Sequence, residues 1–366
     1  MADSRLCNGI IGQQRACRIL EATLKAGQFP PMLFTGPIGV GKRTCAIKMA
    51  QAANCEAESA RPCGKCRPCR TIALLRHPDI KLIVPLPPKR KKSPTETKAE
   101  DETANVLQVA VEESQNYLLG KPQPNLDPKR KISIELVRWV RKEMAKPPIM
   151  APHRFFIFLH AHQMTPQAAN ALLKTLEEPQ KQTTFILTTD KPNELFDTIR
   201  SRCRLVKFSA IPAGTIQDWL VEKTDTKKEE AVLAAQISNG SPGTALRFLK
   251  DPDEFLSAPV KKFFSLPKAD TKAILSTMKE LQRTPLATVV STLFFLYHQT
   301  LMTKHGLETE YARGEPAIGR KAELCGTDYL RRVMKYLSGR LEDCRMYLNR
   351  RLFLYTLLSS LRKPIK

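Results

Sequence analysis

The sequence predicts an α/β domain built on a parallel sheet, followed by helical domains. Short apolar strands alternate with helices over residues 1–209, and a glycine-rich loop joins one strand to one helix. Such alternation is typical of parallel βαβ units. Beyond about residue 210 only helical periodicity is present. We therefore expect an α/β domain over 1–209, a small helical domain over 210–252 and a C-terminal helical domain over 253–366.

The individual elements follow from apolar periodicity and from the residues that end each segment. The best-marked helix begins after Thr165, which can cap it, has Pro166 in its first turn and is followed by Pro179. Strands are expected at 32–35, 80–84, 154–159, 184–189 and 205–208. Helices are expected at 16–26, 42–51, 134–144, 165–178, 215–223 and 229–238, with several longer ones from 259 onward.

The composition indicates a globular protein with an anionic partner. Hydrophobic residues make up 42% and charged residues 26% of the 366, which excludes a wholly disordered or fibrous chain. Lys and Arg number 59 against 36 Asp and Glu, a formal net charge of +23. A polyanion, with nucleic acid first, is therefore an expected partner. The alternative is a lineage in which all proteins are basic.

Two further segments bear on location and organisation. The apolar stretch 286–297 is shorter than the ~20 residues that span a bilayer, so it predicts a buried helix. With no apolar export signal near the start, we expect a cytoplasmic protein without a membrane partner. Residues 89–131 are rich in charge and poor in aromatic residues, which predicts a solvated insertion with one helix around 104–119. A lid and a contact with a partner are equally open as its role.

The glycine-rich loop over 36–42, Gly-Pro-Ile-Gly-Val-Gly-Lys, has the form of a phosphate-binding loop between a strand and a helix. Backbone N–H groups of such a loop surround phosphates, and its lysine reaches the β and γ phosphates of a nucleotide. The expected nucleotide-binding residues are Gly36, Gly39, Gly41, Lys42 and Thr44.

The residues that normally hold magnesium are missing. Arg43 stands where a Ser or Thr is needed, and Thr44, one place later, is turned by about 100° around the helix. The apolar stretch 155–158 runs into Leu159 and His160, whereas working ATPases place an acidic pair there. We therefore expect no ATP hydrolysis by this chain, and leave open whether ATP still binds. The alternative is that acidic residues elsewhere substitute.

Histidines also end that strand. His160 and His162 alternate, so on a strand they would share one face and two metal ligands are geometrically possible. Histidines at strand ends are more often packed or hydrogen-bonded, which is the interpretation we favour.

Four of the ten cysteines form a cluster with metal-ligand spacing: Cys55, Cys63, Cys66 and Cys69. A Cys-x-x-Cys turn brings two thiolates to one tetrahedral ion, and four complete a structural zinc shell. Redox-active thiols are the alternative. The remaining six are expected to be ordinary buried thiols: Cys7, Cys17, Cys45, Cys203, Cys325 and Cys344.

Taken together, these motifs resemble bacterial DNA polymerase III clamp-loader subunits, and among them the delta prime type more than the gamma/tau motor. The resemblance covers essentially the whole chain except 89–131. Its most specific part is Asn170-Ala-Leu-Leu-Lys-Thr-Leu-Glu-Glu-Pro179. The other matching segments are 11–13, 36–42, the four cysteines, 77–79, 198–203, 240–246 and 349–352.

This resemblance implies an AAA+ fold with a helical lid and a C-terminal collar. It implies a subunit that helps load the sliding clamp onto primed DNA, with gamma/tau and delta subunits as partners, as part of the DNA-directed DNA polymerase holoenzyme. Gly243 stands where motor subunits carry a nucleotide-sensing arginine. A non-hydrolysing delta prime subunit would share this pattern.

The resemblance also gives Arg202 a role as an arginine finger that reaches the γ-phosphate held by a neighbouring motor subunit. The alternative is that Arg202 makes a local salt bridge. Two other functions stay open for the chain: an ATP-hydrolysing gamma/tau-like motor, and a stand-alone zinc-containing DNA-binding protein.

Overall fold

The chain is divided into two compact units. The computed structural model describes residues 5–87, 130–224, 226–252, 256–266, 270–284, 286–307, 310–343 and 349–361. The first unit comprises Met1–Thr226 with Ser238–Thr244, and the second Lys227–Ile237 with Ala245–Lys366. The division into three domains at residues 209 and 252 stays a prediction.

A five-stranded parallel sheet forms the centre of the first unit, in the order β2-β3-β4-β1-β5. In the register of this sheet, Leu33 of β1 faces Leu187 of β4 on one side and Leu205 of β5 on the other. The predicted strands are confirmed to within one residue at each end. The strands are β1 (Met32–Thr35), β2 (Ile80–Ile83), β3 (Arg154–Phe158), β4 (Thr183–Thr189) and β5 (Arg204–Lys207).

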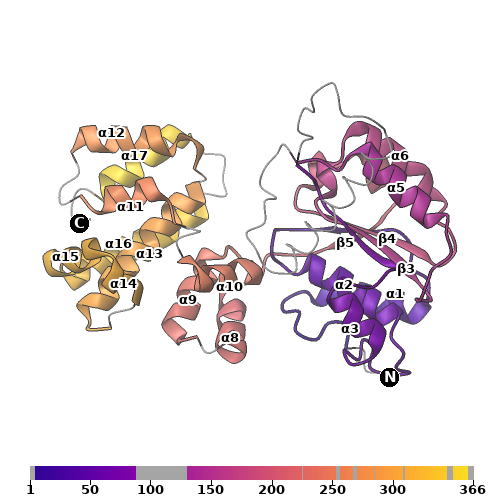
Figure 1. Ribbon diagram of the computed structural model, residues 1–366. Coiled ribbons are helices and arrows are strands. Elements are labelled where there is room, and N and C mark those ends of the chain that lie inside the picture. Colours follow the sequence, from indigo (N-terminus) through magenta and orange to yellow (C-terminus); the bar gives the residue numbers. More distant parts are fainter. Residues whose placement is uncertain are drawn as a thin grey trace, which may run out of the picture. The chain divides into compact units, whose positions relative to one another are not determined.

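Helices cover both faces of this sheet, with α1, α2 and α3 on one face and α5 and α6 on the other (Figure 1). All residues of the three interior strands β3, β4 and β1 are therefore buried, as expected for parallel strands between helical layers. The helices of this unit are α1 (Gln14–Ala26), α2 (Lys42–Ala53), α3 (Arg67–Ala73), α5 (Ile134–Met144), α6 (Pro166–Glu177), α7 (Asp197–Arg200) and α8 (Ala213–Lys223).

The α6 helix follows the predicted signals. The Thr165 side chain accepts a hydrogen bond from Ala168 N at 3.2 Å, and Pro166 occupies the first turn. Helices α3 and α7 were not predicted because both are short. The sequence shows no full apolar period over so few residues.

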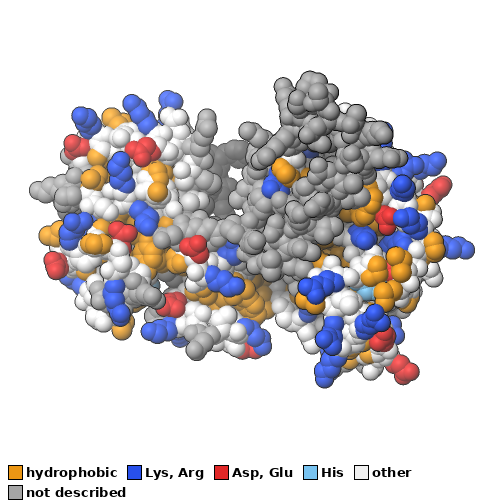
Figure 2. Space-filling view, in the orientation of Figure 1, with side chains coloured by type: hydrophobic (Ala, Val, Ile, Leu, Met, Phe, Trp, Pro, Cys, Tyr) orange, Lys and Arg blue, Asp and Glu red, His pale blue; other side chains and the backbone are white. Residues whose placement is uncertain are grey.

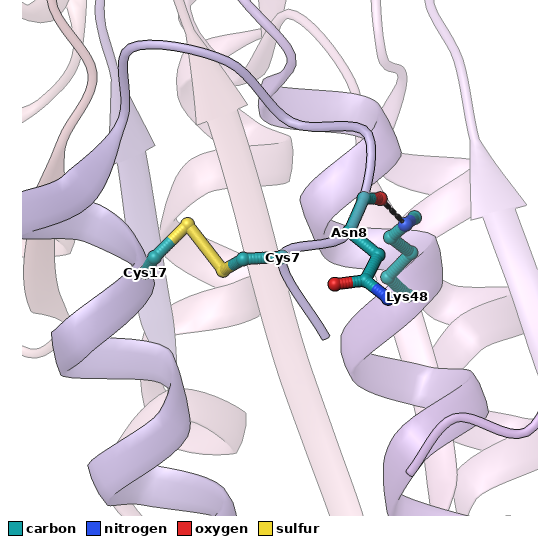
Figure 3. The surroundings of a disulfide bond; sticks show 4 residues. All are labelled: Cys7, Asn8, Cys17 and Lys48. Carbon is teal, nitrogen blue, oxygen red and sulfur yellow. Dashed lines mark hydrogen bonds between the residues drawn. A yellow bond between two sulfur atoms is a disulfide. The ribbon is translucent and has the colours of Figure 1, made fainter. Parts of the chain in front are cut away.

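A disulfide corrects the prediction that Cys7 and Cys17 are free thiols. The turn over residues 6–9 folds the N-terminal segment over the start of α1, which places the two Cα atoms 6.0 Å apart (Figure 3). The Lys48 ammonium also donates to the carbonyl of Asn8, so α2 holds the same segment. Sequence spacing carried no signal for this pair, since the turn that joins them is irregular. Cys45 and Cys203 are buried free thiols as expected, Cys325 is half-buried, and Cys344 lies outside the described residues.

A buried ion pair fixes the loop that leads into β3. Asp79 is fully buried, and its carboxylate accepts hydrogen bonds from the backbone N–H groups of Ile149, Met150 and Ala151 at 2.8–3.0 Å. Arg154 lies 3.4 Å from the same carboxylate and donates to three backbone carbonyls of this loop, those of Glu143, Lys146 and Pro147. The pair therefore provides hydrogen-bond partners for backbone N–H and C=O groups of an irregular segment that is buried away from solvent.

The predicted insertion at 89–131 falls almost wholly outside the described residues, as does the helix expected at 104–119. Its two flanks are described. Leu86 and Lys131 pair in an antiparallel bridge, with N–O distances of 3.0 and 2.9 Å. The segment therefore leaves and re-enters the fold at neighbouring points.

The second unit is helical, as predicted. Its long helix α13 contains the apolar stretch 286–297 and packs against α15 and α16, with Val290, Leu293 and Leu296 buried. Among the residues that the structure describes, no helix is both long and apolar enough to cross a membrane. The helices beyond α8 are α9 (Lys228–Ile237), α10 (Pro242–Lys250), α11 (Ala258–Phe264), α12 (Thr271–Glu280), α13 (Leu286–Lys304), α14 (Glu310–Gly314), α15 (Pro316–Leu324), α16 (Thr327–Asp343) and α17 (Arg350–Ser360).

Candidate functional site

The phosphate loop joins β1 to α2, as predicted, and its glycines have conformations that side chains disfavour. Gly36, Gly39 and Gly41 all have positive φ angles, of 142°, 74° and 102°. A Cβ atom on Gly36 would lie 2.2 Å from the carbonyl oxygen of Phe208, and one on Gly39 would lie 2.1 Å from Ser241 Oγ. The loop backbone therefore has the tight form that the motif predicts, at the N-terminus of α2.

Lys42 lies over this loop. Its ammonium donates to the carbonyls of Gly36 and Pro37 at 2.5 and 2.6 Å. Burial lowers the pKa of Lys42 to about 8, while the negative charge of Asp190 acts in the opposite direction. The lysine is thus held where an anion in the loop would meet it.

The magnesium ligands predicted to be missing are not replaced on β3. Thr44 is exposed on α2, consistent with the turn away from the loop that its shift in sequence implies. Leu159 is buried beyond the end of β3, and His160 follows it. The acidic pair of a working ATPase has no counterpart at this strand end.

Sequence reasoning missed one carboxylate near the loop, that of Asp190. This residue directly follows β4, which lies between β1 and β3 in the sheet. The carboxyl ends of parallel strands meet at one edge, so a residue just after β4 lies beside the phosphate loop. The position of Asp190 after the predicted strand 184–189 was the available signal, but the order of strands was needed to use it.

The His-x-His pair lies beside this carboxylate. His160 Nδ1 is 3.4 Å and His162 Nδ1 is 3.9 Å from Asp190 Oδ1, and His162 Nδ1 is 3.0 Å from Thr189 Oγ1. Burial raises the pKa of Asp190, but the hydrogen bond from His160 and the charges of both histidines outweigh it and lower this pKa below its ordinary value. Burial lowers the pKa of His162, and Asp190 opposes that shift.

Gly243 approaches the phosphate loop through its backbone. Its N–H donates to the carbonyl of Gly39 at 3.1 Å, and a Cβ atom here would lie 3.1 Å from the same oxygen. The position where the resemblance places a nucleotide-sensing arginine is therefore a close backbone contact, at the start of α10. Close approach favours glycine at this position.

The four clustered cysteines converge in space. Their sulfur atoms all lie within 4.8 Å of one another, with Cys55 and Cys69 buried and Cys63 and Cys66 half-buried. Cys55 follows α2, Cys66 caps α3 and Cys69 lies on α3. Gln51 of α2 donates to the carbonyl of Cys69 at 2.6 Å, which ties the two helices together.

Backbone N–H groups prepare this cluster for thiolates. Lys65 N and Cys66 N donate to Cys63 Sγ at 3.4 and 3.3 Å, and Cys63 N donates to Cys55 Sγ at 3.3 Å. The bonds from Cys66 and Lys65 lower the pKa of Cys63 to about 6. Burial and the neighbouring cysteines raise the pKa of Cys69. Four soft sulfur donors at this spacing fit a tetrahedral zinc ion.

Arg202 lies just after α7 at the surface of the first unit. Its Nε donates to Glu177 Oε1 at 2.5 Å, and its Nη1 donates to the carbonyl of Thr198 at 2.9 Å. About one third of the Arg202 side chain remains exposed. The local salt bridge is therefore present, with Glu177 at the end of α6, and the finger role stays a prediction.

A basic hollow that was not predicted lies along α5. Its cavity of about 470 Å³ is lined by Arg138, Arg141, Lys142, Met144 and Gln180. The three cations are spaced by three and four residues, so they share one helix face, and all three are exposed. Figure 2 shows that Lys and Arg side chains elsewhere are spread over the visible face of the molecule.

The family model described as DNA polymerase III, delta subunit, matches residues 12–212, which is more than half of the chain. This chain belongs to that family. The parallel sheet with a phosphate loop after β1, followed in the described part of the sequence by helices alone, confirms the predicted α/β fold with a helical C-terminal portion.

Relatives of both predicted kinds are found. The chain is 30% identical to DNA polymerase III subunit delta′ of Bacillus subtilis over 228 residues, covering 62% of this chain and 56% of that protein. It is 25% identical to subunit delta′ of Escherichia coli over 269 residues, covering 72% and 68%. It is 27% identical to subunit gamma/tau of Mycobacterium tuberculosis over 247 residues, covering 66% and 36%. The match thus spans about half of the Bacillus delta′ subunit and about a third of gamma/tau.

Proposed function

We propose that this chain is a delta′-type subunit of the DNA polymerase III clamp loader that does not hydrolyse ATP and helps load the sliding clamp onto primed DNA. Family membership supports the assembly, with gamma/tau and delta subunits as partners. One observation carries the non-hydrolysing role: the phosphate loop keeps its form while Leu159 and His160, not an acidic pair, follow β3. Phosphoryl transfer needs a carboxylate-bound magnesium ion to neutralise the charge that develops.

Asp190 is the specific observation in favour of the alternative, an ATP-hydrolysing motor of gamma/tau type. Its carboxylate lies at the sheet edge beside Lys42, but His160 and His162 face it. Phosphate release by the purified chain, with and without primed DNA, separates the two functions. We expect background rates that Lys42→Ala leaves unchanged. DNA-stimulated turnover that Lys42→Ala abolishes would establish the motor instead.

Arg202 is proposed to act in trans on a neighbouring motor subunit, where its guanidinium would stabilise charge on the transferred phosphoryl group. To do so, it exchanges its bond to Glu177 for the phosphate. In the reconstituted loader, Arg202→Ala should slow ATP hydrolysis at the adjoining site by about 10³-fold or more. The total ATP turnover of the loader should therefore fall by the fraction that this site normally contributes. Arg200→Ala is the matched control, since this neighbouring arginine pairs with Asp197 on the same short helix. Equal turnover for both variants, with intact assembly, would eliminate the finger.

Zinc is proposed as a structural ion in the four-cysteine cluster. The fit of the four sulfurs and the three N–H···S bonds support it. Such an ion contributes on the order of 10 kcal/mol to local folding. By elemental mass spectrometry, we expect Cys63→Ser/Cys66→Ser to hold one zinc ion per chain fewer than the wild type, and Cys325→Ser to hold as many as the wild type. Full zinc loss without any change in protection of α3 amides from hydrogen exchange would contradict the structural role.

Primed DNA is proposed to meet the basic hollow of α5. The cavity presents Arg138, Arg141 and Lys142 on one face, and phosphate-backbone attraction needs no sequence readout. A stand-alone DNA-binding protein would use the same surface. Light scattering with and without gamma/tau separates the two, because a loader subunit joins the complex and a stand-alone protein stays apart.

A further inference from the structure

A second cluster of metal-ligating side chains lies apart from the cysteines, at the carboxyl ends of β3 and β4. His160 and His162 belong to the turn after β3, and Asp190 directly follows β4. The two strands are parallel neighbours, with Phe158 facing Leu187. One ligand atom from each of the three side chains lies within 4.8 Å of the other two. Topology therefore brings together residues that are 30 positions apart in sequence.

The separations match those around a single ion. A tetrahedral zinc with nitrogen and oxygen bonds of ~2.0–2.1 Å holds its ligands about 3.4 Å apart. His160 Nδ1 and Asp190 Oδ1 are 3.4 Å apart, and His162 Nδ1 and the same oxygen are 3.9 Å apart. The two histidine ligand atoms lie within 4.8 Å of each other, so side-chain rotations would have to bring them closer to share one ion.

Two features hold the histidines in place. His160 has φ and ψ of 51° and 51°, a left-handed conformation that costs a non-glycine residue energy and that clusters at functional sites. Thr189 Oγ1 lies 3.0 Å from His162 Nδ1 and accepts from Lys191 N at 3.0 Å. An ion on His162 Nδ1 would displace this hydroxyl contact, because an outer hydrogen bond to a metal-binding histidine uses its other ring nitrogen.

We propose that His160, His162 and Asp190 bind one divalent first-row transition ion, with zinc as the reference, in addition to the ion in the cysteine cluster. Two imidazoles and one carboxylate suit zinc, cobalt or nickel, whereas magnesium prefers an all-oxygen shell. Three protein ligands leave a fourth position for water. The ion would bridge the ends of the neighbouring strands β3 and β4 beside the phosphate loop, independently of whether the chain joins a clamp loader.

Zinc stoichiometry of the full chain tests the proposal. After equilibrium dialysis against buffered zinc, elemental mass spectrometry should find two ions per chain in the wild type and one in His160→Ala/His162→Ala. The matched controls are His305→Ala, an exposed histidine of the second unit, and Asp197→Asn, an exposed carboxylate; both should keep two ions. Asp190→Asn, which preserves side-chain size, should lower the affinity for the second zinc ion by at least about 10-fold.

Cobalt provides a second readout that does not depend on the folding of any variant. Cobalt in the cysteine cluster gives thiolate-to-metal charge-transfer absorption, whereas cobalt bound by histidine and aspartate adds ligand-field bands without it. We expect two spectrally distinct steps in a titration of the wild type, the second unaffected by excess magnesium. A single thiolate step, a second ion that persists in the double histidine variant, or its displacement by magnesium would overturn the proposal.

Discussion

At the scale of single residues, the Asp79–Arg154 pair gives a short sequence motif a structural role. The segment His77-Pro78-Asp79 carried part of the resemblance, but its sequence gave no hint of its role. In the structure Asp79 accepts three backbone hydrogen bonds and faces Arg154 in full burial. A carboxylate with this many donors is stabilised in its charged form despite burial.

The pH dependence of stability follows from this pair. Burial raises the pKa of Asp79, but the hydrogen bonds from Ile149, Met150 and Ala151, with help from Arg154, lower it below its ordinary value. A carboxyl with a depressed pKa stabilises the fold above its unfolded pKa of ~3.9 and loses that effect as pH falls through the folded value. Urea denaturation should show a lower free energy of unfolding for Asp79→Asn than for the wild type at neutral pH. The difference between the two free energies should become smaller in acid.

The matched control for Asp79 is Asp197→Asn, whose side chain is 89% exposed. We expect this variant to follow the wild type at every pH. Removing one partner of a buried ion pair typically costs about 3–5 kcal/mol, and Asp79→Ala should fall in that range. A constant gap between wild type and Asp79→Asn from neutral to acid pH would show that the carboxylate is not the source of the stability.

At the scale of elements, the strands and most helices were predictable because burial and turn residues leave periodic signals. Met32–Thr35 and Ile134–Met144 agree with the prediction residue for residue. The Cys7–Cys17 disulfide and the approach of Asp190 to Lys42 were not predictable, since both depend on how segments meet in space. The sequence therefore indicated the position of the phosphate loop and the convergence of the four cysteines. It did not indicate that Asp190, at the end of β4, lies beside the loop.

The phosphate loop allows a test of its tight geometry. Gly36→Ala places a Cβ atom 2.2 Å from the Phe208 carbonyl, whereas Gly27→Ala has a positive φ of 65° but nothing within 4 Å. Thermal unfolding should therefore show a loss of about 1–2 kcal/mol for Gly27→Ala, from backbone strain alone. Gly36→Ala should lower the free energy of unfolding by clearly more, because its Cβ atom also collides with the Phe208 carbonyl. Equal losses would mean that the contact between the loop and Phe208 yields easily.

At the scale of the whole molecule, the net charge of +23 was the earliest sign of an anionic partner. Charge alone does not locate a surface, because basic side chains are spread over the visible face (Figure 2). The hollow along α5 differs in combining three cations with a concave shape. Sequence periodicity placed these cationic residues on one helix. The cavity could not be predicted, because it also depends on where the chain after α6 places Gln180.

The salt dependence of DNA binding measures how many DNA phosphates the cations of this hollow neutralise. The logarithm of DNA affinity should fall linearly with the logarithm of salt concentration, with a slope of about −0.9 per phosphate neutralised. Arg138→Ala/Arg141→Ala should therefore flatten the slope by about two. Arg331→Ala/Arg332→Ala, which removes the same charge from the exposed surface of α16, is the control and should leave the slope unchanged. Equal slopes in the two double variants would place the DNA elsewhere.

The bridge between Leu86 and Lys131 has a consequence for how this protein tolerates change in length. The fold fixes the two ends of the intervening stretch side by side, so the chain between them has no distance to cover. Lengthening a loop whose ends already meet costs only about 0.6 kcal/mol for each doubling. The fold therefore accommodates a change in the length of this stretch at little cost in stability, while the sheet, the phosphate loop and the cysteine cluster keep their structure.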